Sequence, residues 1–349
     1  MLFKLQIIAW ISIQAILSWR YGTLGQLEFY SNDQRFYARA ITELATFQIE
    51  FSTDFLIGYL KLPYVAPASL LYLIGIHPIL SCKIVSLGFL LLSTKTLIGC
   101  GVIPDTSRGQ LKAAYLTGMF GVGIFFGSLA QRDIAIVYFV LIAVTNRPNS
   151  QSSLGLFCVY LLRPHLAVGL LFGIVVSRIF RSCQAYYLAV LPVLVVSAVL
   201  GHLGFAIGTI LLDGQPIQLY GHRWGIFPIW RIVSNLIGFG FLTANPDTVP
   251  STVPELLLIR IVFSEIVVIP ILGILYLLRG PNVVEFFGRV SIVGIFSGFV
   301  FYLGTVTVTD FNSLRQNLAF IVLLGAIVSQ KSMADAGQNP RRQLASSGD

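Results

Sequence analysis

Charged residues are scarce in this sequence. Only 11% of its 349 residues are Asp, Glu, Lys or Arg, whereas an ordinary soluble domain has about 25%. Hydrophobic residues make up 56% of the chain, and its mean hydropathy is +0.81. A water-soluble fold cannot bury that much apolar surface, so lipid must cover part of it. The composition argues against a soluble domain and predicts an integral membrane protein.

Residues that form disulfides or bind transition metals are also few. The chain has four cysteines and four histidines, and they are scattered, without a CxxC pair or a ligand cluster. This spacing argues against a disulfide framework and a dedicated metal site, and it predicts buried, inert thiols. The residues are Cys82, Cys100, Cys158, Cys183, His77, His165, His202 and His222.

Basic residues outnumber acidic residues, which gives a net charge of +8. No basic run alternates with aromatic residues in the way that a nucleic-acid-binding surface requires. The excess is typical of loops held at an anionic cytoplasmic leaflet. The sequence therefore predicts a lipid-facing protein that does not bind nucleic acid.

Long apolar segments fill most of the chain. About ten of them approach the roughly 20 residues that a transmembrane helix needs, although the fifth and tenth are short. We therefore expect an all-α, polytopic transmembrane helix bundle over residues 1–330, followed by a disordered cytoplasmic tail over 331–349. The predicted spans lie near 3–19, 60–76, 79–100, 113–130, 134–146, 154–177, 185–212, 256–278, 288–306 and 316–330.

The basic residues predict the orientation of these spans. Two short loops and the tail carry the basic residues, and ten spans with both termini inside place all three on the cytoplasmic side. External loops are then expected at about 20–61, 213–255 and 305–315. The residues behind this orientation are Arg178, Arg181, Arg279, Arg289, Lys331, Arg341 and Arg342.

Residues 226–242 are also hydrophobic, but they include Arg231, Ser234 and Asn235. As an additional span, this segment would move two of the basic regions to the outside, against the rule that basic loops stay in the cytoplasm. We interpret it as an interfacial or re-entrant helix within the external loop. An ordinary span is the alternative.

Residues 34–47 predict an amphipathic helix in the first external loop. Phe36, Ala40, Ile41, Leu44 and Phe47 recur at helical spacing, which is typical of a helix lying on the membrane surface. Two interpretations fit Asp33, which precedes this helix. It is either a helix cap or a general base that takes a proton from an acceptor hydroxyl.

Arg163, Pro164 and His165 interrupt the sixth predicted span. Ionisable residues inside a membrane are costly and are candidates for a functional role. One interpretation is an aqueous cavity, about a third of the way in from the outside, where Arg163 holds a phosphate. The other is a kinked helix in which Arg163 pairs with a structural carboxylate.

Four further polar residues fall in the predicted external loops. Arg315 stands at the mouth of the last span as a second phosphate contact or a snorkelling side chain. Arg223 lies beside Trp224, which suits sugar or phosphate binding, or interfacial anchoring. With His222 and Asp310, these residues face the same side as Asp33, Arg163 and His165 in the predicted topology.

Other polar and small residues lie within or between spans. We expect Arg132 and Asp133 to form an ion pair in a cytoplasmic turn, whereas Arg260 and Glu265 are not spaced to pair with each other on one helix. Small-xxx-small pairs predict close helix packing. They are Gly123 with Gly127, Gly204 with Gly208, and Gly294 with Gly298.

Several stretches show a family resemblance. SNDQRFYARAITELA, followed by LPYVAPASLLYLIGIHP, resembles the start of GT-C-type membrane glycosyltransferases. GSLAQRDIAIVYFVLIAV and YLLRPHLAVGLL are similar to segments of bacterial envelope-polysaccharide membrane proteins, including O-antigen polymerase-like ones. VTDFNSLRQNLAF resembles an external loop that ends in an arginine before the last span. A lone Asp33 stands where many GT-C members have paired acidic residues.

The resemblance implies an integral membrane glycosyltransferase of the bacterial cytoplasmic membrane. It would use polyprenyl-phosphate-linked sugars on the external face in cell-envelope polysaccharide assembly, with Asp33 as base. Arg163 and Arg315 would hold the phosphate. A repeat-unit polymerase for O-antigen or exopolysaccharide is one alternative, and a transporter or flippase of lipid-linked glycans is another. The expected partners are the polyprenyl-linked sugar or oligosaccharide, membrane lipid and other polysaccharide-assembly proteins. No cofactor is required, although a divalent cation at Asp33 stays open.

Overall fold

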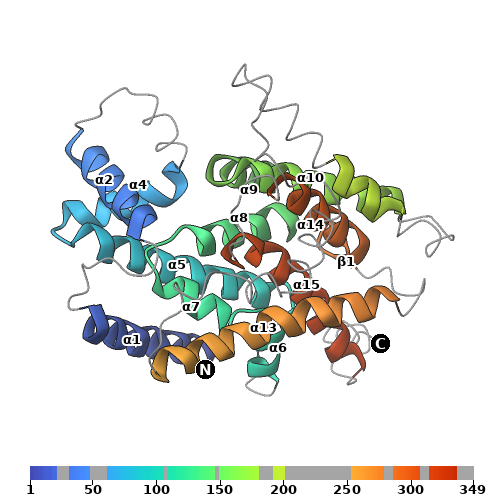
Figure 1. Cartoon of the computed structure of the whole chain (residues 1–349), viewed down its shortest axis with the longest axis horizontal. Helices are drawn as coiled ribbons and strands as arrows, with labels where there is room; N and C mark the ends of the chain where they lie inside the picture. The colour runs from blue at the N-terminus through green and yellow to red at the C-terminus, as the bar shows by residue number, and fades with distance from the viewer. Residues whose placement is uncertain are drawn as a thin grey trace, which may run out of the picture.

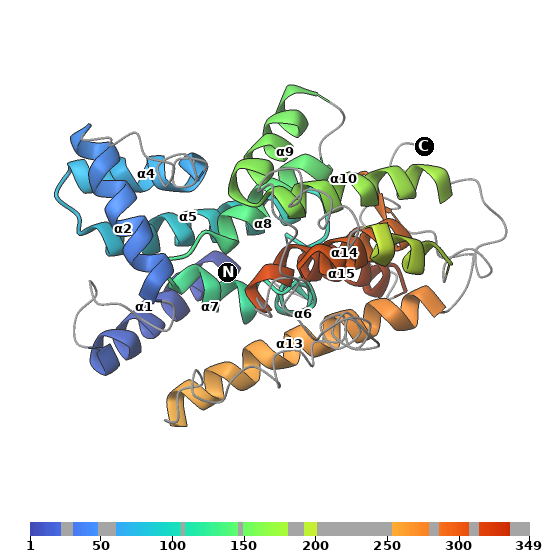
Figure 2. The same cartoon turned by 45° about the horizontal axis from the view of Figure 1, so that its top comes forward.

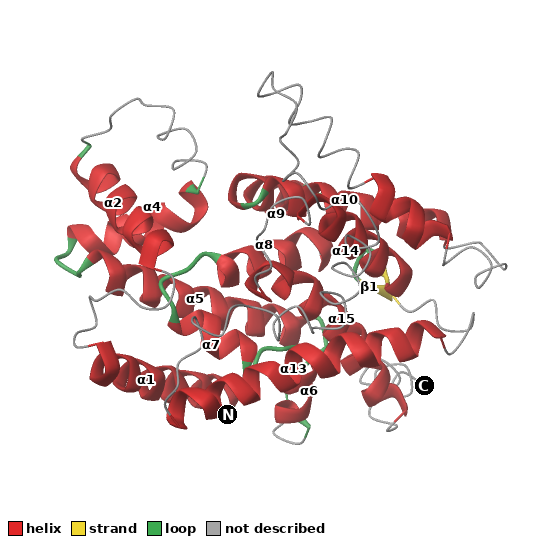
Figure 3. Ribbon diagram, in the orientation of Figure 1, coloured by secondary structure: helices red, strands yellow, loops and turns green. Residues whose placement is uncertain are grey.

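The computed structural model describes residues 1–21, 31–47, 61–105, 109–145, 149–180, 192–200, 253–278, 286–306 and 314–335. Within these ranges the chain is helical apart from turns and one short hairpin (Figure 1, Figure 3). The prediction of an all-α fold is confirmed. The predictions for residues 226–242, for the tail beyond 335 and for Gly204 with Gly208 fall outside the described residues.

The helices follow the predicted apolar segments in order. They are α1 (Leu2–Tyr21), α2 (Ser31–Thr46), α4 (Leu62–Leu73), α5 (Pro78–Gly99), α6 (Gln110–Leu116), α7 (Val122–Ser128), α8 (Asp133–Thr145), α9 (Ser150–Leu162), α10 (Pro164–Ile179), α13 (Val253–Leu278), α14 (Ile292–Val306) and α15 (Leu314–Asp335). An antiparallel hairpin of β1 (Phe286–Phe287) and β2 (Val290–Ser291) precedes α14. In both views, α2 and α4 lie at one end of the molecule and α13 runs along an outer edge (Figure 1, Figure 2).

Two predicted spans are each made of two helices. The fourth is divided between α6 and α7, with a turn that contains Gly118 at a φ of 68°. The sixth is divided between α9 and α10 at Arg163, whose φ of −157° and ψ of 88° are not helical. Pro164 begins α10 and has no backbone N–H to continue the preceding helix. The fourth predicted span is therefore not one continuous helix, whereas the predicted interruption of the sixth span at Arg163 and Pro164 is confirmed.

The break at Arg163 is a sharp turn in the chain. Ser152, near the start of α9, accepts a hydrogen bond from Arg289, and Ser177, near the end of α10, accepts one from the Ser291 amide. A straight helix would separate these two serines by about 38 Å. Both instead contact one short segment of the hairpin, so α9 and α10 meet at an angle.

Two described helices are long and apolar enough to cross a membrane, namely Leu2–Trp19 and Pro78–Gly99. The other apolar helical stretches whose side chains are described are shorter, at 10–17 residues. Ten spans therefore stay a prediction.

Paired glycines bring α10 and α14 into backbone contact. A Cβ added at Gly173 would lie 2.5 Å from the Gly294 carbonyl oxygen, and one at Gly298 would lie 2.5 Å from the Gly169 carbonyl oxygen. The predicted close packing of Gly294 and Gly298 is confirmed, and their partners are a second glycine pair, Gly169 and Gly173. Such contacts allow two helices to pack at short separation.

Helix α1 is held to the broken fourth segment by polar side chains. Gln6, Trp10 and Gln14, one helical turn apart, donate hydrogen bonds to the carbonyl oxygens of Met119, Gly127 and Ser128 at 3.0, 2.9 and 2.7 Å. The last carbonyls of a helix have no partner within it. The polar stripe of α1 therefore satisfies one backbone carbonyl in the turn between α6 and α7 and two at the end of α7.

Helix α2 confirms the predicted amphipathic helix but not all of its apolar face. Tyr37, Ala40, Ile41 and Ala45 are buried, and the helix packs against α4 and α5. Phe47 lies beyond the end of the helix at a φ of 54° and is 84% exposed. The prediction that Phe47 lies on the buried face of the helix was therefore wrong, because the helix ends at Thr46.

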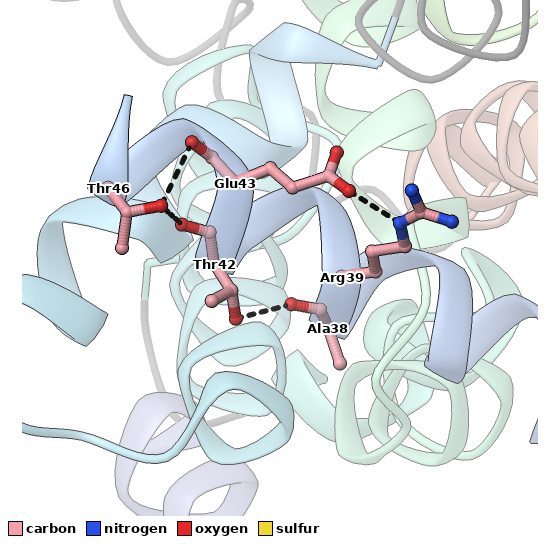
Figure 4. A network of polar contacts seen from close by, with 5 residues as sticks. All are labelled: Ala38, Arg39, Thr42, Glu43 and Thr46. Atoms are coloured by element: carbon pink, nitrogen blue, oxygen red, sulfur yellow. Dashed lines mark hydrogen bonds and ion pairs between the residues drawn. The ribbon is translucent and has the colours of Figure 1, made fainter. Parts of the chain in front are cut away.

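The opposite face of α2 carries a polar network (Figure 4). Arg39 pairs with Glu43 one turn later, and the Thr42 and Thr46 hydroxyls donate to the Ala38 and Thr42 carbonyl oxygens at 3.0 and 2.8 Å. The Arg39 side chain is 71% exposed. An exposed pair of this kind contributes about 0.5 kcal/mol or less, so it marks the outer face of α2 and adds little stability.

Candidate functional site

An ion pair joins the break between α9 and α10 to the start of α8. Arg163 Nη2 donates to Asp133 Oδ1 at 3.2 Å, and the two side chains are only 11% and 2% exposed. Asp133 is the first residue of α8, where a negative charge also interacts favourably with the helix dipole. The contact matches the predicted interpretation in which Arg163 pairs with a carboxylate.

Tyr302 of α14 contacts the same ion pair. Its side chain is 1% exposed, and its hydroxyl accepts a hydrogen bond from Arg163. The charges of Asp133 and Arg132 also act on this hydroxyl. Three parts of the chain that are far apart in the sequence therefore meet at one buried polar cluster, which we call the arginine cluster. It consists of Arg132, Asp133, Arg163 and Tyr302.

Arg132 adds a second guanidinium group to the arginine cluster. Its Nη1 atom is buried and has no hydrogen-bond partner among the described residues. Asp133, which was expected to pair with Arg132, is instead hydrogen-bonded to Arg163. Among the described residues, the cluster contains two guanidinium groups and one carboxylate, and therefore one excess positive charge. Buried charge is costly unless it is compensated, so this arrangement suits an anion.

His165 lies beside the arginine cluster. It follows Arg163 by two residues, in the first turn of α10, and the charge of Arg163 acts on it. Its side chain is on the exposed side of α10. The structure therefore keeps His165 near Arg163, as predicted, but places it outside the buried cluster.

The predicted depths of these residues were inconsistent with one another. Arg132 and Asp133 were placed in a cytoplasmic turn and Arg163 in the outer part of a span, yet Arg163 contacts Asp133. The reason is that α8 and α9 have only 13 residues each, or about 20 Å. After crossing that distance and returning, the chain is level with Asp133 again.

A second contact also contradicts the predicted topology. The Arg289 amide donates to the Val144 carbonyl oxygen at 3.0 Å, and Arg289 Nη1 donates to Ser152 Oγ at 2.7 Å. Arg289 was predicted to be cytoplasmic and the end of α8 to be external. The structure places both at the same end of the bundle. The orientation drawn from basic residues is therefore wrong for at least one of these segments.

The remaining predicted site residues are placed only in part. Asp33 lies in the first turn of α2, and Arg315 is the second residue of α15, but the side chains of both are outside the described residues. His222, Arg223 and Asp310 fall outside the described residues altogether. The structure therefore brings together Arg163 and His165 from the predicted set, and it adds Arg132, Asp133 and Tyr302.

Glu265 forms a second buried polar contact. Its side chain is 0% exposed, and its two carboxylate oxygens accept hydrogen bonds from the Gly121 and Val122 amides at 2.7 and 2.6 Å. These amides begin α7 and have no helical partner. A Cβ on Gly121 would lie 2.9 Å from the carboxylate carbon, so glycine is needed for this approach. An acidic residue within an apolar run was the sequence signal for this role.

No group of three or more His, Cys, Asp or Glu side chains in the described part of the chain is arranged to bind a metal ion. Cys82 and Cys158 are buried thiols, which agrees with the prediction of inert cysteines for these two positions. The arginine cluster is therefore the best candidate for a functional site within the described residues.

No family model, curated protein or solved structure matches this chain.

Proposed function

We propose that the protein is an integral membrane protein whose helices face lipid. The supporting feature is apolar side chains on the outside of several helices. On α10, Val168, Leu171, Val175 and Ile179 are 44–62% exposed, whereas the opposite face of the helix is buried. A helix that is apolar on all sides belongs in a membrane or a large core. Exposed apolar residues of the same kind include Ile8, Ile11, Leu70, Ile74, Leu154, Phe157, Val195 and Leu275.

The predicted ten spans fit this proposal with two changes. The α6–α7 and α9–α10 segments are broken helices, and non-helical backbone within a membrane is tolerated where protein surrounds it. The Glu265 carboxylate and the polar side chains of α1 satisfy the backbone at the first break. Helix α13, with 26 residues, is about 39 Å long and can cross a bilayer with a tilt.

We further propose that the protein is a glycosyltransferase that uses polyprenyl-phosphate-linked sugars in cell-envelope polysaccharide assembly. The arginine cluster is the observation that carries this proposal. Within the described part of the chain, Arg132 offers a buried N–H group without a partner, and the cluster has one excess positive charge. A phosphodiester, which links a sugar to a polyprenyl phosphate, has one negative charge. A pyrophosphate has at least two, so the charge favours single-sugar transfer over repeat-unit polymerisation.

The chemistry follows from the charges. Asp33 would take the proton of an acceptor hydroxyl, whose oxygen forms a bond to the anomeric carbon while the bond from that carbon to the phosphate oxygen breaks. The departing polyprenyl phosphate gains a negative charge. Arg132 would stabilise that charge through its Nη1 group, because fixed donors aimed at a developing charge act strongly in a dry site. Arg163, held by Asp133 and Tyr302, would set the position of the phosphate.

A transporter or flippase of lipid-linked glycans is the second candidate, and the broken helices favour it. Transporters use discontinuous helices whose ends face the substrate or a coupling ion near the middle of the membrane. The carboxylate of Glu265 at the start of α7 is a contact of that kind. The two candidates differ in where lipid-linked material accumulates when the protein is lost.

The lipid-linked and surface glycans of a deletion strain test the proposal. Single sugars accumulating on the polyprenyl carrier, with the polymer lost or shortened, support transfer, and accumulated complete repeat units support polymerisation. Lipid-linked glycans confined to the cytoplasmic leaflet support transport. An unchanged glycan profile contradicts all three. Complementation with Arg132→Gln, compared with the exposed-site control Arg39→Gln, connects the phenotype to the arginine cluster.

A further inference from the structure

A chain of buried hydrogen bonds runs from α4 through α5 to the residue before Arg132. The Tyr64 hydroxyl lies 3.0 Å from Ser86 Oγ, and Ser86 Oγ donates to the Gln131 carbonyl oxygen at 3.0 Å. Tyr64 and Ser86 are 0% exposed and Gln131 is 1% exposed. Neither Tyr64 nor Ser86 was singled out by the sequence, and neither belongs to the arginine cluster.

The protons in this chain have a fixed direction. Ser86 has one hydroxyl proton, and it goes to the Gln131 carbonyl oxygen, so Tyr64 must be the donor to Ser86. The single Tyr64 proton is shared between Ser86 Oγ and the Cys82 carbonyl oxygen, which lies at 3.2 Å. The order is therefore Tyr64 to Ser86 to Gln131, and removing either hydroxyl removes part of the support for Gln131.

The Gln131 carbonyl lies where it controls Arg132. The first backbone bond of α8 runs from the Ile136 amide to the Arg132 carbonyl oxygen, so the carbonyl of Gln131 precedes the helix. Its hydrogen bond with Ser86 fixes the peptide plane between Gln131 and Arg132. That plane sets the direction in which the Arg132 side chain leaves the backbone, and therefore where its Nη1 group lies.

The same chain reaches α2. The Tyr37 ring packs edge-on against the Tyr64 ring at a centroid distance of 5.3 Å, and Lys61 Nζ lies 4.2 Å from the centroid of Phe36. Edge-to-face ring pairs and cation–π contacts are both attractive and add to the packing of the two helices. Helix α2, which bears Asp33 one turn before Tyr37, is therefore held against the residue that begins the hydrogen-bond chain.

We propose that Tyr64 and Ser86 are positioning residues that hold Arg132 in place for a phosphate group, and that they connect α2 to the arginine cluster. This inference rests on the proposed function, because it assigns Arg132 to a polyprenyl phosphate. It adds that the affinity of the cluster for a phosphate depends on two hydroxyl groups that do not contact the phosphate.

The test is binding of geranylgeranyl monophosphate to the purified full-length protein in detergent. Geranylgeraniol, which has no phosphate, measures binding through the apolar chain alone. The variants Ser86→Ala and Tyr64→Phe each remove one hydroxyl, and Tyr64→Phe keeps the ring against Tyr37. Ser69→Ala is the matched control, because among the described residues the buried Ser69 hydroxyl bonds only to the Val65 carbonyl oxygen within its own helix. Ser86→Thr keeps the hydroxyl and is the rescue variant.

Ser86→Ala and Tyr64→Phe are expected to weaken binding of the phosphate about three- to tenfold, the effect of one lost hydrogen bond, at an unchanged affinity for geranylgeraniol. Ser69→Ala and Ser86→Thr should bind as the wild type does. Unchanged phosphate binding in both hydroxyl-deletion variants, with the wild type binding normally, overturns the positioning role and leaves the proposed function standing. A wild-type protein that does not distinguish the phosphate from the alcohol overturns the proposed function and this inference with it.

Discussion

Arg163 Nη2 donates to Asp133 Oδ1 at 3.2 Å, although the two residues are 30 positions apart in the sequence. The contact links the first residue of α8 to the point at which α9 gives way to α10. Both side chains are almost fully buried, so water does not compete for their hydrogen bond as it does at a surface ion pair. It fixes the geometry of the chain turn and also the position of the arginine that we assign to a phosphate.

Removing Asp133 alone should destabilise the protein strongly. Asp133→Ala leaves the Arg163 guanidinium buried without its carboxylate, which costs about 3–5 kcal/mol. We expect a clear fall in the melting temperature in detergent and in the amount of protein in the membrane. The double variant Asp133→Asn with Arg163→Gln should melt at a higher temperature than Asp133→Ala, because the excess positive charge of the cluster stays at one, as in the wild type, instead of rising to two. Equal melting temperatures for all forms would show that the pair has no structural role.

Arg132→Gln, in contrast to Asp133→Ala, should reduce function without destabilising the protein. Because Arg132 Nη1 has no partner among the described residues, removing its charge is expected to leave the melting temperature unchanged or higher but to reduce glycan assembly by tenfold or more. The measurement is glycan output per amount of membrane-inserted protein. Normal output at normal abundance would remove the basis for assigning a phosphate to Arg132.

Asp33→Asn distinguishes the two interpretations of Asp33. Asp33 is the third residue of α2 and not its N-cap, so in a structural role its carboxylate interacts with the helix dipole, and asparagine costs at most about 1 kcal/mol. A general base does not tolerate the change, because an amide cannot accept the proton. We expect glycan assembly to be lost while the protein stays in the membrane at its usual level. Normal assembly by Asp33→Asn would show that the role of Asp33 is structural.

The sequence predicted the helices well and the contacts between them poorly. Apolar segments identify helices because each one has a composition of its own, and Pro164 marked a break. The pairing of Arg163 with Asp133 depends on the equal lengths of α8 and α9, which place the two residues at one level. Composition alone does not determine how deep in the bundle each residue lies. The predicted partner of Asp133 was therefore its neighbour Arg132, and Asp133 and Arg163 were predicted at different depths although they are in contact.

The same limit applies to Glu265 and to the α6–α7 break. The sequence marks Glu265 as an acidic residue in an apolar run, but its partners are backbone amides more than 140 positions away. Backbone groups have no side-chain signature that a sequence can show. The glycines at 118 and 121 were the available signal, and a run of apolar residues around them had favoured a single helix.

Glu265 is expected to hold the start of α7. Glu265→Ala leaves two buried amides without partners, each at a cost of about 1–3 kcal/mol, and should lower the melting temperature substantially. Glu265→Gln keeps one acceptor oxygen and should cost about half as much. Glycan profiles of the two variants separate the candidates, because a transporter that depends on this carboxylate fails with Glu265→Gln at normal abundance. An intact melting temperature in Glu265→Ala would contradict the capping role.

The contact between α10 and α14 should tolerate no side chain at its centre. A Cβ on Gly294 would overlap Ser177 Oγ and the Gly173 carbonyl oxygen, so Gly294→Val must push the two helices apart. Overpacking of this kind costs about 1–3 kcal/mol. It would also displace Tyr302, which follows on the same helix and bonds to Arg163.

Gly88→Ala is the matched control for this substitution. Gly88 lies within helix α5, and no atom is within 4 Å of the added Cβ. Alanine also favours a helix over glycine by about 1 kcal/mol. We expect a lower melting temperature and reduced phosphate binding for Gly294→Val and neither effect for Gly88→Ala. If Gly294→Val lowers the melting temperature but leaves phosphate binding unchanged, α14 supports the fold without setting the geometry of the arginine cluster, and Tyr302 then has no part in holding Arg163 for its ligand.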